Sequence, residues 1–538
     1  MGIERRAGVR GGVVLGAILL ASGAIGLEAQ RSAVPAKPDD KAIVHVLNRL
    51  GFGPAPGDVA RVRELGLARY IDEQLEPATT PDESMAARLA AFTTLSMSTR
   101  DLAREYYLPA LMQRRQAQRA QTAAANSEMM APERPAQEAQ QRERTVMTEL
   151  MQQKVLRAVY SERQLEEVMV DFWFNHFNVF VGKGQTRIYL TEYERDTIRP
   201  RVFGRFRDLL GAVAESPAML FYLDNWQSAA PADAETMARP GRRGALRRPQ
   251  VPQQQNRRRG INENYARELM ELHTLGVDGG YTQKDVQEVA RAFTGWTIDM
   301  PRQGGAFRFE PRIHDNGEKQ VLGKKIPAGG GKRDGEMVLD LLVKQPSTAR
   351  FIATKLARRF VADEPPSALV DRAAARFRQT DGDIREVVRT IITSPEFFAA
   401  STYRAKVKTP LEFVASAVRA TGADIQNGMP LVQTLRQLGM PLYGCQPPTG
   451  YSDKAEAWVN TGALLNRMNF AVALAGNRVG RGNRLLDRGG EVRVTHAQIA
   501  SDVMADDIAA TTTQTIAKAT NEPQRIALLL GSPEFQKR

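Results

Sequence analysis

Apolar residues recur along most of this chain at the three- and four-residue spacing that is typical of amphipathic helices. The three clearest sets are Leu165, Val168, Met169 and Phe172; Val286, Val289, Ala290 and Phe293; and Leu464, Leu465, Met468 and Val472. The second set has a defined start, because Thr282 followed by Asp285 three residues later resembles a capping box. A further helix is expected over residues 42–50. The pattern predicts a mainly α protein, an irregular body of many helices.

A short junction occurs three times, in which an apolar helical run is followed by Ser-Pro and then by Met or Phe. The pairs are Ser216-Pro217, Ser394-Pro395 and Ser532-Pro533. Serine suits the N-cap and proline the first position of a new turn. We expect the Met or Phe to fold back onto the preceding helix.

One segment does not follow the helical period. Residues 307–313 alternate, His314-Asp315-Asn316-Gly317 supplies turn residues, and residues 319–326 continue the extended pattern. Asn-Gly between two extended runs is typical of a hairpin. The sequence therefore predicts one small β-hairpin around residues 307–326, with His314 and Asp315 at its tip.

The first 29 residues have the layout of a secretion signal. A cationic start over Met1–Arg10 precedes an uncharged, apolar stretch over Gly11–Leu27, and cleavage is expected after Gly26 or Ala29. The alternative is an uncleaved anchor, although five glycines interrupt the apolar stretch. We predict export to the periplasm or the cell exterior. No later segment approaches the ~20 apolar residues of a membrane helix, so the mature chain should lack a transmembrane span.

Residues 30–538 are predicted to form a single, mostly helical domain. Two low-complexity segments, at about 114–144 and 227–260, are interpreted as inserts without regular structure, although the middle of the first has the composition of a polar helix. The lone Cys445 excludes an intramolecular disulfide. Stability must therefore come from packing.

The net charge of +13 is concentrated in one stretch, Ala238–Gly260, which holds eight arginines and no acidic residue. The favoured interpretation is a solvated, disordered insert. The alternative is a surface that contacts anionic lipid, polysaccharide or nucleic acid. Because the chain is predicted to be exported, we expect no nucleic-acid partner. Anionic components of the cell envelope remain as the partners that this stretch could contact.

The densest polar group lies in a predicted helix that Asn262 can cap and Gly276 can end. Asn264, Glu268 and Glu271 fall on one face at positions i, i+4 and i+7. Two carboxylates one turn apart can bind a cation, or share a proton so that one acts as a general acid.

A simpler interpretation of the same helix is a solvated face. Arg267 stands four residues after Glu263 and four before Glu271, so it can form an ion pair with each. Without further information this interpretation is favoured.

Two histidines are candidates for chemistry. His176 falls on the apolar face of the helix that contains Leu165, where a lone histidine is more often a buried, hydrogen-bonded residue than a ligand. His314 next to Asp315 is a possible metal or acid–base pair, or a turn without further role. The chain has no nucleophile elbow, phosphate loop, dinucleotide fingerprint or His-Glu-x-x-His motif.

These segments resemble the bacterial exported proteins grouped as domain of unknown function 1800. The resemblance rests on residues 45–53, 172–177, 201–210, 216–224, 262–276, 281–296, 314–315, 406–412 and 458–460. It implies an exported, mainly α-helical protein, often encoded beside a second exported family, with no established activity. The motif positions it carries over are His176, Asn262, Glu263, Asn264, Arg267, Glu268, Glu271, His314 and Asp315. The chain departs from the family at Pro447–Tyr451, where Gly-Trp is usual, so no stacking role is carried over there.

Two hypotheses follow, and no motif decides whether the protein is an enzyme. The first is a cell-envelope binding or assembly protein with a polar centre between helices, in which Asn262, Glu263, Asn264 and Arg267 form a binding or hydrogen-bond network. The alternative is a metal-assisted hydrolase. Its catalytic residues would be Glu268, Glu271, His314 and Asp315, and its metal ligands His176, Glu268, Glu271 and His314. Such a site would suit zinc, manganese, calcium or magnesium.

Overall fold

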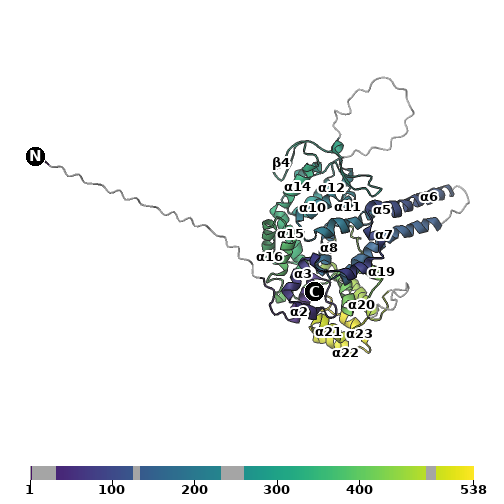
Figure 1. Ribbon diagram of the computed structural model, residues 1–538, viewed down its shortest axis with the longest axis vertical. Helices are drawn as coiled ribbons and strands as arrows, with labels where there is room; N and C mark the ends of the chain where they lie inside the picture. The colour runs from purple at the N-terminus through teal and green to yellow at the C-terminus, as the bar shows by residue number, and fades with distance from the viewer. Residues whose placement is uncertain (1, 3–31, 125–133, 232–259, 480–491) are drawn as a thin grey trace, which may run out of the picture.

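The computed structural model describes residues 2, 32–124, 134–231, 260–479 and 492–538. Helices dominate these residues (Figure 1), which confirms the predicted mainly α class. The predicted signal peptide lies outside the described residues apart from Gly2. The arginine-rich stretch lies outside them apart from Gly260.

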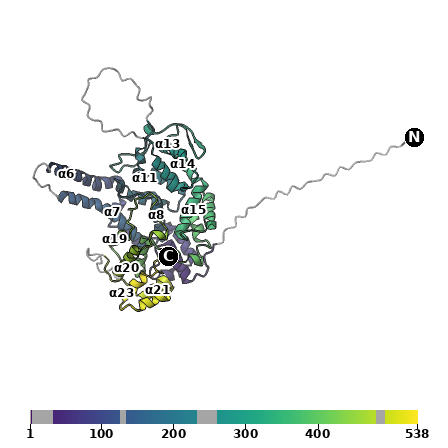
Figure 2. The ribbon, with the colours of Figure 1, turned by 180° about the vertical axis from the view of Figure 1, so that it is seen from behind.

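The N-terminal part of the fold is helical throughout. Its helices are α1 (Asp40–Leu50), α2 (Asp58–Leu65), α3 (Leu67–Leu75), α4 (Glu83–Leu89), α5 (Thr99–Leu102), α6 (Leu108–Ala124), α7 (Arg134–Tyr160), α8 (Gln164–His176), α9 (Leu190–Glu192), α10 (Phe206–Glu215) and α11 (Pro217–Tyr222). Helices α6 and α7 lie side by side and project from the body (Figure 2).

The middle of the chain holds the strands of the described structure. Its elements are α12 (Glu263–Met270), α13 (Gln283–Ala292), β1 (Trp296–Ile298), β2 (Phe307–Phe309), β3 (Lys319–Val321), β4 (Lys324–Ile326), α14 (Arg333–Val343), α15 (Pro346–Phe360), α16 (Ser367–Gln379) and α17 (Ile384–Ile392). A π-helical turn, Glu271–Leu275, continues α12.

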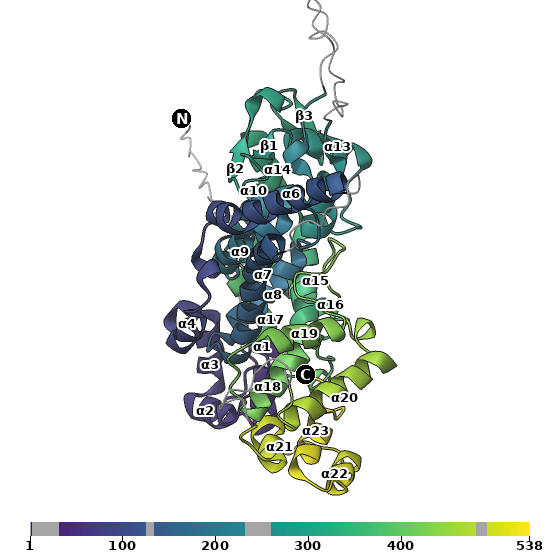
Figure 3. The same cartoon turned by 90° about the vertical axis from the view of Figure 1, so that its right-hand side faces the viewer.

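The remaining helices are α18 (Pro410–Thr421), α19 (Met429–Gln437), α20 (Thr461–Ala475), α21 (His496–Met504), α22 (Ala510–Ala517) and α23 (Glu522–Leu530). Figure 3 shows the order of the helices and strands along the long axis of the molecule. The strands lie at one end with α13 and α14, α20–α23 lie at the other, and α7, α8 and α15 lie between them. Side chains that reach α8 and α15 are therefore in the middle of the body.

The local signals for helices are confirmed where they were strongest. Helix α13 begins with the predicted capping box, in which the side chains and backbone amides of Thr282 and Asp285 bond reciprocally. At the three Ser-Pro junctions Met219, Phe397 and Phe535 are buried, as expected for residues that fold back. These features are local in sequence, so no distant partner was needed to predict them.

The predicted hairpin over residues 307–326 is wrong in its strand pairing. Strand β2 pairs with β1, with Trp296 opposite Phe309, and β3 pairs with β4. The tight turn is at Leu322-Gly323, where both residues have positive φ. At Asn316-Gly317, in contrast, the amide of Gly317 donates to Asp315 Oδ1 at 2.9 Å. His314 is buried rather than exposed at a tip.

The first low-complexity segment is also more ordered than predicted. Helices α6 and α7 cover residues 114–124 and 134–144, and residues 125–133 lie outside the described part. The reason is composition: Ala, Gln, Arg and Glu all have high helix propensity. A segment with few apolar residues can therefore still be helical.

The predicted C-terminal helix exists as α20, but three of the four apolar residues that predicted it face solvent. Leu464 and Leu465 are 53% and 61% exposed, and Val472 is 43% exposed. The buried side of α20 instead carries Phe470 and Leu474 and packs on α23. Two faces of this helix are apolar, and only the position of α23 decides which is covered.

One buried group of charges ties distant parts of the chain together, and we call it the charge cluster (Arg49, Arg359, Glu412 and Arg538). All four residues are at most 3% exposed. Glu412 Oε1 lies 2.5 Å from Arg359 Nη1 and 3.0 Å from Arg538 Nη2. Its other oxygen accepts from the amide of Thr409 at 2.8 Å. Burial opposes the ionised carboxylate, but the two arginines prevail and lower the pKa of Glu412 to about 2.

We expect Glu412→Gln to lower the free energy of unfolding by about 3–5 kcal/mol, because it leaves two buried guanidinium groups without their carboxylate. Chemical denaturation at neutral pH measures this difference. The matched control is Glu364→Gln, which removes a carboxylate from an exposed pair with Lys454 and should change stability little.

The difference between Glu412→Gln and the unmodified chain should also depend on pH. The pKa of Glu412 is lower in the folded state than its ordinary value of 4.5. Its stabilisation is therefore complete above pH 4.5 and is lost as the pH falls towards 2. A difference that stayed constant over this window would contradict the assignment.

Candidate functional site

The motif residues lie around two separate polar centres. The His176 centre consists of His176, His273 and Lys355, and lies where α8, the π-helical turn and α15 meet. The Asp334 centre consists of His314, Lys319 and Asp334, and lies at the end of the molecule that carries the strands. Each is described in turn.

In the His176 centre the imidazole has a partner at each nitrogen. His176 is 1% exposed, its Nδ1 lies 2.9 Å from Lys355 Nζ, and its Nε2 lies 3.2 Å from the carbonyl oxygen of His273. A protonated lysine only donates, so Nδ1 is the acceptor and Nε2 carries the proton. The carbonyl of His273 therefore fixes the tautomer of His176.

Burial governs the protonation of this centre. It lowers the pKa of His176 well below its ordinary value, with a smaller contribution from Lys355, and it lowers the pKa of His273 to about 3. Lys355 is partly buried, and this burial lowers its pKa to about 8. A lysine that titrates near neutral pH can serve as a base or nucleophile.

The segment at Pro447–Tyr451 is fastened to α8 beside this centre. Asn175 accepts from the amide of Tyr451 at 2.6 Å and donates to its carbonyl at 2.7 Å. Asn178 donates to the carbonyls of Cys445 and Pro447. Gly450 has φ +74, and a Cβ there would lie 2.2 Å from the carbonyl oxygen of Asn175. The segment that departs from the family pattern is thus held against α8 by two asparagines.

The two carboxylates of the predicted acidic face are neighbours, as expected. Tyr281 donates its hydroxyl to Glu271 at 3.1 Å. Burial raises the pKa of Glu268, and the charge of Glu271 raises it further against the opposing effect of Arg267. A carboxyl with a raised pKa can donate or accept a proton.

The expected ion pairs of Arg267 are replaced by contacts through α13. Gln283 accepts from Arg267 at 2.7 Å and donates to Glu263 at 2.6 Å. Asn262 caps α12 as predicted, since its side chain accepts from the amide of Tyr265, and it also donates to the carbonyl of Leu223. Most of the polar residues on this helix thus bind neighbouring elements.

Asn264 differs from the other motif positions of this helix. Its side chain is exposed, and it makes no hydrogen bond within the described structure. Gly276, with φ +84, ends the π-helical turn as the sequence indicated. The helix therefore keeps one exposed carboxamide that no intramolecular partner uses.

In the Asp334 centre a lysine ammonium lies beside the carboxylate. Asp334 and the side chain of Lys319 are fully buried, and Lys319 Nζ lies 2.6 Å from Asp334 Oδ2. His314 Nε2 lies 3.2 Å from the same oxygen, and His314 Nδ1 lies 2.7 Å from the carbonyl oxygen of Thr294. Lys319 also donates to the carbonyl of Asp315 at 2.5 Å. The ammonium therefore takes the position beside these oxygens that a bound cation would need.

Asp315 lies at the edge of this arrangement: its Oδ1 is 3.8 Å from Lys319 Nζ, but its main partner is Arg291. Arg291 Nε and Nη2 lie 2.8 Å and 3.1 Å from the two carboxylate oxygens, a bidentate contact. Arg291 also pairs with Glu288. The pKa of Asp315 is lowered, since hydrogen bonds from Arg291 and from the amide of Gly317 outweigh burial.

The structure therefore brings together only part of the predicted metal set. Glu268 and Glu271 are neighbours, whereas His176 and His314 have different partners in different centres. Within the described ranges no group of three or more His, Cys, Asp or Glu side chains is arranged to hold a metal ion. The ligand assignments of His176, Glu268, Glu271 and His314 remain predictions.

Three important residues of these centres were not predicted. Lys355 and Lys319 are charged residues in amphipathic segments, where a lysine ordinarily indicates an exposed position. Asp334 had one signal, the glycine run before it. A Cβ on Gly330 would lie 2.0 Å from Asp334 Oδ1, so the glycine makes room for this carboxylate. A glycine run of this kind indicates close packing, but it does not identify the residue that packs against it.

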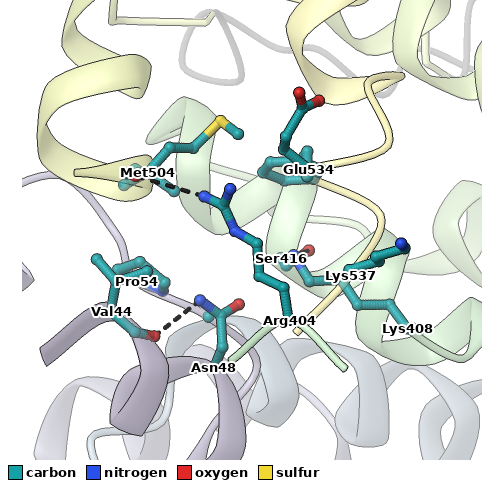
Figure 4. A pocket seen from close by; sticks show the side chains of 12 residues that line it. Val44, Asn48, Pro54, Arg404, Lys408, Ser416, Met504, Glu534 and Lys537 are labelled. Atoms are coloured by element: carbon teal, nitrogen blue, oxygen red, sulfur yellow. Dashed lines mark hydrogen bonds between the residues drawn. The ribbon is translucent and has the colours of Figure 1, made fainter. Parts of the chain in front are cut away.

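A small cavity lies beside the charge cluster, between α1, α18 and α21 (Figure 4). Its volume of about 10 Å³ suits a single water molecule rather than a substrate. Lys408 lines it, donates to Ser416 at 3.1 Å and lies 4.1 Å from the ring centroid of Phe535. Burial lowers the pKa of Lys408 to about 7. This cavity is a gap in the packing of charged residues and has no room for a ligand.

Comparison with known families agrees with the motifs around both centres. The family described as "Protein of unknown function (DUF1800)" matches residues 45–537. The chain belongs to this family. A comparison with curated proteins and one with solved structures each found no match. The family match covers α8, α12 and the Asp334 centre, so both polar centres lie inside the DUF1800 region.

We expect Lys355→Met to change how stability depends on alkaline pH. The folded state lowers the pKa of Lys355 from 10.5 to about 8, so between these values the unfolded chain binds more protons. The unmodified protein should therefore gain stability relative to the variant as the pH rises from 8 to 10.5. Denaturation of both proteins across this range measures the gain. A parallel pH dependence of the two would show that the ammonium is not buried as described.

Proposed function

We propose that this DUF1800 protein is an exported, non-catalytic binding or assembly protein of the cell envelope. In this proposal the motif residues form polar centres that fix the helices. One observation carries it: both motif histidines use both ring nitrogens on partners within the chain. A histidine that binds a metal ion needs a free ring nitrogen, and neither of these two histidines has one, which argues against the metal-assisted alternative.

The location is supported by the N-terminal sequence, which has the charge, length and small residues of a secretion signal. In the described part of the chain, no helix has the length and apolar character to cross a bilayer. The proposal therefore places the protein in the periplasm or outside the cell.

The proposal includes two kinds of partner. One is a co-encoded exported protein, which the family resemblance suggests. The other is an anionic component of the envelope, which the eight arginines of Ala238–Gly260 would attract. Both would use surface residues and leave the two buried centres unchanged.

Elemental analysis of the purified protein, with His314→Ala and Glu268→Ala alongside, tests the proposal against a metal-assisted hydrolase. We expect no stoichiometric zinc, manganese, calcium or magnesium in any of the three proteins. His314→Ala should lose about 1–3 kcal/mol of unfolding free energy, because it removes a buried hydrogen-bond partner of Asp334. Glu268→Ala, which removes a partly exposed side chain, should change stability by about 0.5 kcal/mol or less.

The opposite pattern would overturn the proposal. It consists of one metal ion per chain in the unmodified protein and its loss in both variants. In that case Glu268 and His314 would share a site that the described arrangement does not show, and the hydrolase interpretation would replace this one.

A further inference from the structure

A large groove lies between α19 and α20. Figure 3 shows these two helices in the half of the molecule away from the strands. Its volume of about 620 Å³ falls within the range of roughly 300–1,000 Å³ that is usual for ligand sites. None of the motif residues lines it. The groove is therefore separate from both polar centres.

Uncharged amide side chains line both walls of this groove. Gln433 and Gln437 stand one turn apart on α19, and Asn466 and Asn469 stand nearly one turn apart on α20. Asn466 donates to the carbonyl of Gln437 at 3.1 Å, which links the two walls. The side chains of Gln433, Gln437 and Asn469 are exposed and make no hydrogen bond within the described structure.

The chemistry of these walls favours a ligand with many hydroxyl groups. Each carboxamide offers two donor hydrogens and an acceptor oxygen, which matches a hydroxyl that both donates and accepts. The residues that line the groove include no carboxylate, and their one charged side chain is Arg478. A cation or an amine would find no counter-charge here.

A peptide fits the groove less well. Peptide segments that bind between helices place apolar side chains in a hydrophobic groove. Here the apolar lining residues Leu438 and Phe470 are only 6% and 5% exposed, and Ala473 and Val479 are only partly exposed. The groove therefore offers little apolar surface to the side chains of a peptide. The described strands lie at the other end of the molecule, so strand addition has no edge at this site.

We propose that the groove between α19 and α20 binds a neutral glycan through the carboxamides of Gln433, Gln437 and Asn469. The proposal names a ligand class for the binding role described above and rests on that role. The glycan would lie along the groove, with its hydroxyl groups towards the two amide walls.

Calorimetric titration of the full chain with cellohexaose, maltohexaose and hexa-N-acetylchitohexaose tests this proposal. At least one of these neutral oligosaccharides should bind. The double substitution Gln433→Leu/Asn469→Leu should weaken binding at least ten-fold without changing the melting temperature, because both side chains are exposed. Gln514→Leu, at an exposed amide on α22 outside the groove, is the matched control and should bind like the unmodified protein.

Three results would overturn the groove assignment. They are no binding of any neutral oligosaccharide, binding that the double variant retains, and groove-dependent binding of hexagalacturonate or of an uncharged hexapeptide in their place. Hydrolysis of a bound oligosaccharide would have a different meaning. It would leave the groove assignment standing and contradict the non-catalytic role proposed for the protein.

Discussion

The fold depends on one carboxylate that neutralises two buried arginines. Glu412 belongs to the capping box at the start of α18, so its position is fixed by the backbone of its own helix. Its partners come from α15 and from the last residue described, and Arg49 of α1 lies in the same electrostatic environment. A buried carboxylate that is satisfied in this way fixes the relative positions of segments that are remote in sequence. Displacement of any one of them would leave a charge without a partner in a low-dielectric interior.

Helix α15 connects this charge cluster to the His176 centre. Arg359 and Lys355 are one turn apart on the helix, and the first contacts Glu412 while the second contacts His176. Any shift of α15 along its axis would therefore disturb both groups together. A polar residue of a family motif can therefore fix the position of a helix. A hydrogen bond between buried groups requires a particular distance and direction, whereas apolar contacts allow a helix to shift.

Features that depend on neighbouring residues could be predicted from the sequence. Features that depend on residues far away in the chain could not. The capping box at Thr282, the cap at Asn262 and the end of α12 at Gly276 follow from neighbouring residues, and the structure confirms them. The pairing of β2 with β1 was missed because the burial of Trp296, eleven residues before the strand, decides it. Lys355 was missed for a related reason, since nothing near it in sequence shows that an imidazole will reach it. Lys319 stands four residues after Asp315, but its closest carboxylate, Asp334, comes fifteen residues later in the chain. The acidic neighbours Glu268 and Glu271 were predictable, since helical spacing alone brings them together.

The charge cluster also has a consequence for the order of folding. Its members are residues 49, 359, 412 and 538. Glu412 stands 53 residues after Arg359 and 126 residues before Arg538, so the chain must close two long loops before the carboxylate meets both arginines. Contacts at such separation form slowly, since the entropy of loop closure opposes them until late in folding. Helices such as α8 and α13 can form early from local signals, but the charge cluster is completed only when the segment that carries Arg538 is available. A chain that is still being synthesised would therefore hold Glu412 and Arg359 without their third partner until the segment that carries Arg538 has been made.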